Sequence, residues 1–197
     1  MDMHLVTKKH LEETMRLWQS TITELKRLED FLSIERINDQ FYRRLFIRCV
    51  FSIIETYLYV TKELIKIKLT IDSPQGIQLT WEELVILNEK KVFLDNQGKV
   101  KTKDEYQRFD SSLKFTLNTF SSMLGMGLPD YGDNKFQTLI MLATRRNDIT
   151  HPKSLSQLLI KDQEMKDTVE VFRWFMETHG TINKKYIQWI SELSGRK

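Results

Sequence analysis

The sequence has few of the residues that interrupt helices or build covalent and metal frameworks. Cysteine occurs once in 197 residues, which excludes an intramolecular disulfide and a CxxC zinc site. Three prolines and seven glycines leave long segments without a helix breaker. There is no HxxxH or HExxH pair, no acidic cluster, no glycine-rich phosphate loop and no G-x-S-x-G turn. We therefore expect neither a metal nor another cofactor.

Long apolar runs and a strong excess of charge are also missing. The most hydrophobic window, residues 45–60, contains Arg48 and Glu55 and is too short to span a bilayer. The first fifteen residues lack the apolar core of a signal peptide. The formal net charge of +3 permits nucleic-acid binding without indicating it. We expect a cytoplasmic protein without membrane contact, in which Cys49 is a small buried hydrophobe.

Apolar residues recur at spacings of three and four along most of the chain, which is typical of amphipathic helices. The second helical segment is apolar on nearly every side and is predicted to be central. Gly180, preceded by His179, is a candidate point for a bend or a break in the last helix. The sequence predicts a single all-α domain over residues 1–197, with about five long helices at 8–33, 39–69, 104–126, 134–151 and 162–193.

Residues 70–103 are interpreted as an insertion in this bundle. The segment Asp72-Ser-Pro-Gln-Gly76 predicts a break after the second helix. Thr80, with Glu83 three residues later, fits a capping box that opens a short helix over 81–88. A polar turn containing glycine within residues 92–101 predicts a small β-hairpin. A lone hairpin is marginally stable, so it should pack against the helices or a partner.

The helix predicted from Asn134 ends in a group of polar residues. Arg145, Arg146, Asn147 and Asp148 follow an apolar run, and Pro152 disfavours the α conformation at His151. Arg146 and His151 are five residues apart, so their Cβ directions differ by about 140° on an ideal helix. They converge if the helix end unwinds at Pro152 or if a second chain completes the pocket. A two-fold dimer would place two such pairs around one groove.

This segment, Arg146-Asn147-Asp148-Ile149-Thr150-His151, resembles the motif of the HEPN superfamily, which is an arginine, a polar residue, at least three further residues and a histidine. Arg145 fits the longer variant with five intervening residues. The resemblance implies a HEPN-like all-α bundle and a metal-independent endoribonuclease that acts as a homodimer. It also implies a toxin or phage-defence effector, with RNA as substrate and an antitoxin or another defence protein as partner. The insertion at 70–103 is not part of the minimal family bundle.

The residue types suit cleavage of RNA by its own 2′-hydroxyl. A histidine titrates near neutral pH, so His151 can act as general base or acid. Arg146 can hold the phosphate bidentately and stabilise the growing negative charge, and Asn147 can orient the phosphate or the imidazole. A need for the 2′-hydroxyl restricts such an enzyme to RNA. Further candidates are Lys153 for substrate binding, and Arg145, Asp148 and Glu55 in supporting positions.

Two alternatives remain open at these residues. Glu55 lies in the middle of the central helix, where it forms a salt bridge with Arg48 or Lys62, or else orients Arg146 or Arg145. His151 serves catalysis, or it only caps its helix while Arg146 pairs with Glu55 or Asp148. In the second case the chain is a non-catalytic helical interaction module or RNA-binding module.

Overall fold

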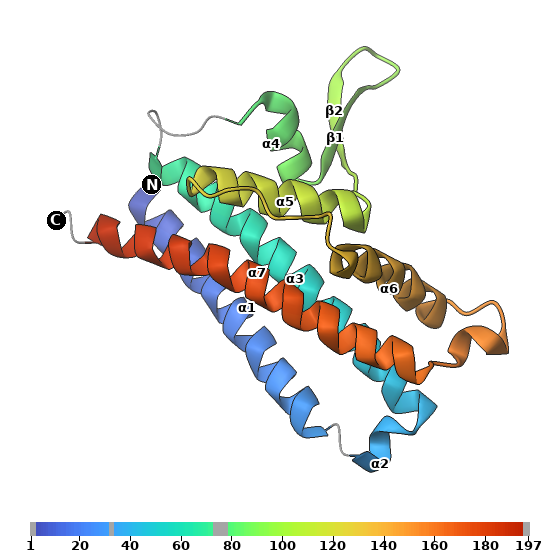
Figure 1. The fold of residues 1–197 in the computed structure, drawn as a ribbon. Helices are drawn as coiled ribbons and strands as arrows, with labels where there is room; N and C mark the ends of the chain where they lie inside the picture. The colour runs from blue at the N-terminus through green and yellow to red at the C-terminus, as the bar shows by residue number, and fades with distance from the viewer. Residues whose placement is uncertain (1–2, 32–33, 73–78, 195–197) are drawn as a thin grey trace.

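The computed structural model describes residues 3–31, 34–72 and 79–194, and its architecture is a bundle of helices with one small hairpin (Figure 1). This confirms the predicted all-α class. The break predicted over residues 72–76 lies, after Asp72, outside the described residues, as does the predicted end of the first helix at residue 33. The elements are α1 Met3–Phe31, α2 Ile34–Ile37, α3 Gln40–Asp72, α4 Trp81–Leu87, β1 Lys90–Leu94, β2 Val100–Asp104, α5 Phe109–Met123, α6 Asn134–Thr150, the 3-10 turn η1 Leu155–Leu158 and α7 Asp162–Ser194.

Helix α3 is the centre of the bundle, as its apolar sequence predicts. It packs against α1, α5, α6 and α7, and its residues between Phe46 and Ile67 supply much of the buried core. A helix that contacts neighbours on several sides needs apolar residues around most of its circumference. Cys49, on the same helix, is partly buried, and burial and then the charge of Glu24 raise the pKa of its thiol.

The segment after residue 79 folds as predicted into a short helix and a hairpin. The Thr80 hydroxyl accepts from the Glu83 backbone N–H (3.2 Å), and the Glu83 carboxylate accepts from the Thr80 N–H (2.7 Å). In the turn, Asp95 accepts from two backbone N–H groups, and Gly98 takes the left-handed conformation (φ +74°). The hairpin projects away from the long helices (Figure 1).

The predicted start of the third long helix was wrong. We expected it near Asp104, but β2 continues to Asp104 and α5 begins at Phe109. Cross-strand pairing of Lys90 with Asp104 extends the ladder beyond the expected hairpin. At its other end α5 closes with Gly125 in the left-handed region (φ +66°), and the Met126 N–H reaches the Ser121 carbonyl.

Helix α7 runs without interruption through Gly180, so the break considered there does not occur. Phe175, Ile182 and Tyr186 are buried on both sides of the glycine. This packing outweighs the roughly 1 kcal/mol that a glycine costs in a helix interior. None of the described helices combines the length and apolar content that crossing a bilayer requires.

Candidate functional site

Helix α6 carries the motif residues at its C-terminal end, where the helix stops as predicted. The side chain of Asp133 accepts from the Lys135 N–H and opens the helix. At the other end His151 is the first non-helical residue (φ −126°, ψ 62°), and its N–H still donates to the Asn147 carbonyl (2.9 Å). The helix therefore ends immediately before Pro152.

Arg145 is a structural anchor for the segment that follows α6. Its Nε donates to Glu164 of α7 (2.6 Å), and its two terminal nitrogens donate to the carbonyls of Gln157 (2.7 Å) and Leu159 (2.5 Å). The Arg145 and Glu164 side chains are 17% and 19% exposed. With Asp148, Arg145 lines a hollow of about 920 Å³ between α6 and α7. The side chains of Arg145 and Asp148, two of the supporting candidates, therefore line a different hollow from that of Arg146.

Arg146 points instead to α3 and forms an ion pair with Glu55. Its Nη2 contacts Glu55 Oε1, and its Nη1 lies 3.4 Å from Oε2. The guanidinium also lies 5.7 Å from the centre of the Phe51 ring. Its Nε is buried and has no hydrogen-bond acceptor in the described part of the chain. Arg146 is therefore the arginine from another helix that pairs with Glu55, a contact expected both for an orienting role of Glu55 and for a purely structural pair.

Arg48 and Lys62, the other candidate partners of Glu55, bind elsewhere, so the expected salt bridge of Glu55 with one of them was wrong. Arg48 donates to the Ile149 carbonyl, and Lys62 binds Glu89 (2.6 Å) and Ser112 (2.9 Å). The Glu55 side chain is 44% exposed, because its position on α3 faces a hollow rather than the core. Of the partners that the sequence left open for Glu55, Arg146 is the one that pairs with it.

That hollow, which we call the Arg146 cleft, has a volume of about 520 Å³. Arg146 and Asn147 of α6 lie on one wall and Glu55 of α3 on another. The cleft combines both charge signs with exposed aromatic rings. Lys62, which the sequence suggested only as an ion-pair partner of Glu55, also lines it, together with residues that the sequence patterns did not assign: Tyr59, Glu89, Tyr106, Gln107 and Ser112.

Part of this missed set has a sequence signal. Glu55, Tyr59 and Lys62 are spaced four and three apart, so they share one face of α3. Glu89 and Tyr106 lie at the base of the hairpin and are brought to the cleft by the Glu89–Lys62 ion pair. Glu89 adopts a left-handed backbone (φ 51°), which no periodicity would predict.

His151 and Lys153 do not share this cleft within one chain. Both residues are exposed, and neither is among the described residues that line the Arg146 cleft. The Lys153 backbone N–H donates to the Gln157 side chain (2.6 Å), which fixes the chain just after Pro152. The structure thus brings together Arg146, Asn147 and Glu55, whereas His151 is exposed and lies outside the lining of the cleft.

His179 lies in the core and is closed to substrate. It is 1% exposed, its Nε2 lies 2.8 Å from the Thr61 hydroxyl, and its Nδ1 accepts from Asn183 (2.8 Å). Its ring stacks between Trp18 and Phe175. Burial lowers its pKa to about 3, so it is neutral at physiological pH. Its role is structural.

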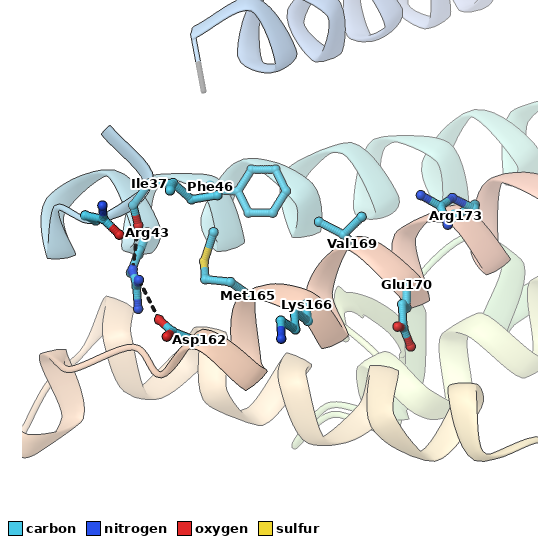
Figure 2. A pocket seen from close by; sticks show the side chains of 10 residues that line it. Ile37, Arg43, Phe46, Asp162, Met165, Lys166, Val169, Glu170 and Arg173 are labelled. Atoms are coloured by element: carbon cyan, nitrogen blue, oxygen red, sulfur yellow. Dashed lines mark hydrogen bonds and ion pairs between the residues drawn. The ribbon is translucent and has the colours of Figure 1, made fainter. Parts of the chain in front are cut away.

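A separate groove of about 490 Å³ lies between the start of α3 and α7 (Figure 2). An ion pair of Arg43 with Asp162 (2.6 Å) closes one end, and apolar side chains including Phe46 and Met165 form its floor. It contains none of the motif residues. In the described ranges, no group of three or more His, Cys, Asp or Glu side chains is arranged to hold a metal ion.

Comparisons of the chain with protein-family models, with curated proteins and with solved structures find no match.

Proposed function

We propose that the chain is a metal-independent endoribonuclease of the HEPN type, in which Arg146, Asn147 and His151 act on a phosphodiester of RNA. The observation that carries this proposal is that Arg146 and Asn147, two adjacent residues of the motif, both line one cleft. Adjacent Arg145 is fully engaged by the scaffold. The chain therefore uses the two arginines differently, and of the two only Arg146 borders this cleft.

The reaction needs a proton acceptor, a proton donor and a cation. The RNA 2′-hydroxyl attacks the adjacent phosphorus, its proton passes to a base, and the leaving 5′-oxygen receives a proton. The products are a 2′,3′-cyclic phosphate and a 5′-hydroxyl. His151 serves as the general base for the 2′-hydroxyl or as the general acid for the 5′-oxygen, a water molecule takes the other proton-transfer role, and Arg146 stabilises the charge that develops on the phosphate.

A homodimer reconciles the separate positions of His151 and the Arg146 cleft. Arg146 and His151 are five positions apart, with four helical residues between them, and this spacing directs their side chains about 140° apart. A two-fold axis near the end of α6 would bring the His151 of one copy to the cleft of the other. Lys153, exposed beyond Pro152, then adds a phosphate contact at the same junction.

Exposed aromatic residues favour single-stranded RNA as the substrate. Tyr59 is 53% exposed and Tyr106 is 79% exposed, and both line the Arg146 cleft. Exposed rings beside a cationic group bind unpaired bases by stacking. A nuclease of this kind would serve as a toxin or phage-defence effector, held in check by an antitoxin or a partner defence protein.

The test is cleavage of single-stranded RNA in EDTA, with analysis of the product ends. We expect 2′,3′-cyclic phosphates, and we expect His151→Ala and Arg146→Ala each to lower the rate by about 100-fold or more, on the order of the loss of one catalytic group. His10→Ala is the matched histidine control, because His10 pairs with Glu63 on another part of the bundle (2.8 Å). Cutting that persists in both motif variants refutes the proposal.

A non-catalytic helical interaction module or RNA-binding module is the second candidate. It is favoured by the existing Arg146–Glu55 pair and by the absence of His151 from the described lining of the cleft. On this hypothesis His151→Ala leaves function intact. A growth assay separates the two functions: toxicity on expression that disappears with His151→Ala supports the nuclease.

A further inference from the structure

The two faces of the β1–β2 hairpin differ in chemistry. Residues directly opposite in an antiparallel ladder point to the same face, and the register pairs Lys91 with Lys103 and Phe93 with Lys101. These four side chains form one face, which we call the basic face, and all are exposed. Val92, Leu94, Val100 and Thr102 occupy the other face, where Lys90 pairs with Asp104.

The basic face carries cations that the protein does not neutralise. Lys91 lies 3.3 Å from the Glu105 carboxylate. Lys101 and Lys103 form no ion pair with any described residue. Like charges directly opposite each other destabilise a ladder, and Lys91 faces Lys103. The Lys91–Glu105 pair relieves part of this repulsion, and an anionic ligand on Lys101 and Lys103 would relieve the remainder.

We propose that the basic face of the hairpin binds the phosphate backbone of single-stranded RNA. Lys101 and Lys103 contact successive phosphates, and Phe93, 40% exposed between the lysines, stacks on an unpaired base. The bound RNA strand then leads to the Arg146 cleft. Glu89 lies immediately before β1 and Tyr106 shortly after β2, and both residues line that cleft. This inference rests on the proposed function and adds a binding surface for its substrate.

The hairpin suits a nucleic acid better than an anionic membrane. A ribbon that inserts into lipid needs an apolar tip, whereas this turn is Asp95-Asn96-Gln97-Gly98 and holds the Asp95 carboxylate by backbone hydrogen bonds. The exposed apolar residues Leu94 and Val100 lie on the other face of the hairpin from the lysines. The apolar side chains that would insert into lipid and the lysines that would contact anionic headgroups are therefore on different faces of the hairpin.

The test is fluorescence anisotropy with a labelled single-stranded RNA of about 12 nucleotides, within the length that one binding groove covers, in a His151→Ala background that prevents cutting. Lys101→Gln with Lys103→Gln is expected to weaken binding roughly tenfold at about 0.1 M salt and to reduce the salt slope by about 1.4, or about 0.7 for each phosphate that is no longer neutralised. Phe93→Leu is expected to weaken binding about fivefold, because a stacked base loses its aromatic partner. Circular dichroism confirms that each variant is folded.

Matched variants control for net charge and for the other face of the ribbon. Lys166→Gln with Lys184→Gln changes two lysines of α7 and should leave the slope unaltered, and Leu94→Ala should leave the affinity unaltered. The inference is overturned if the hairpin lysine variant binds RNA like its parent. It is equally overturned if lysine-dependent binding is seen only with vesicles rich in phosphatidylserine. Cleavage by the wild-type chain is measured separately, so lysine-dependent RNA binding without any nuclease activity refutes the proposed function alone.

Discussion

The buried imidazole of His179 makes the stability of the bundle depend on pH in a way that can be calculated. The hydroxyl of Thr61 donates its hydrogen to the Tyr57 carbonyl (2.8 Å), so His179 Nε2–H donates to Thr61 Oγ1. Nδ1 accepts from the Asn183 side chain. Burial lowers the pKa of His179 from 6.5 to about 3, so the folded state holds this ring neutral where the unfolded chain protonates it.

The sign and size of the effect follow from proton linkage. The folded state binds fewer protons than the unfolded state between pH 6.5 and pH 3, so stability is fully present above pH 6.5 and falls as the pH decreases. On going from about pH 7.5 to about pH 5, the free energy of unfolding falls by about 2 kcal/mol, from RT ln(1 + 10^1.5). For a chain of this length that corresponds to roughly 4–8 °C in Tm.

Urea unfolding at about pH 7.5, 6 and 5, followed by circular dichroism, measures this dependence. The comparison variant is His179→Phe, which keeps an aromatic ring between Trp18 and Phe175 but cannot titrate. It should be less stable at about pH 7.5, because Thr61 and Asn183 lose a partner, yet its free energy of unfolding should fall about 2 kcal/mol less on going to about pH 5. Parallel pH profiles for the two proteins would refute a neutral, buried His179.

Two further predictions concern neighbouring side chains. Arg145→Met should lower the free energy of unfolding by about 2–3 kcal/mol, because Glu164 and two carbonyls lose their donors. Arg146→Met should lower it by less than about 1 kcal/mol, because half-exposed Glu55 is readily hydrated. Equal losses in urea titrations would contradict the different roles assigned to the two arginines. Tyr57→Phe should be neutral or stabilising by up to about 1 kcal/mol, because the Tyr57 hydroxyl is buried without a hydrogen-bond partner in the described structure; a clear loss of thermal stability would show that this hydroxyl has a partner.

Sequence patterns predicted the elements whose signals are local. The capping box at Thr80 and the helix end before Pro152 each depend on residues within a few positions, and both occur as expected. Gly180 was a misleading signal because glycine propensity is a weak preference that core packing overrides. The hydrogen-bond partner of His179, Thr61, is 118 residues away in the sequence, so no local pattern predicts this contact.

The candidate site was predictable only in part, for the same reason. Arg146 and Asn147 were found from a contiguous motif, and Glu55 was named as a partner because a carboxylate in a central helix needs one. The choice of Arg146 over Arg48 or Lys62 depends on how α6 lies against α3, which no spacing reveals. Tyr106 reaches the cleft only because the hairpin base is tied to α3 through Lys62.

The three hydrogen bonds of Arg145 have a consequence for whatever binds near His151. They join the last turns of α6 to the backbone at residues 157 and 159 and to the first turn of α7, so the stretch that carries His151 and Lys153 is a short loop fastened at both ends. A fastened loop has already lost most of its freedom before a ligand arrives. Capture of a phosphate or a second subunit at this corner would thus require little additional ordering of the chain.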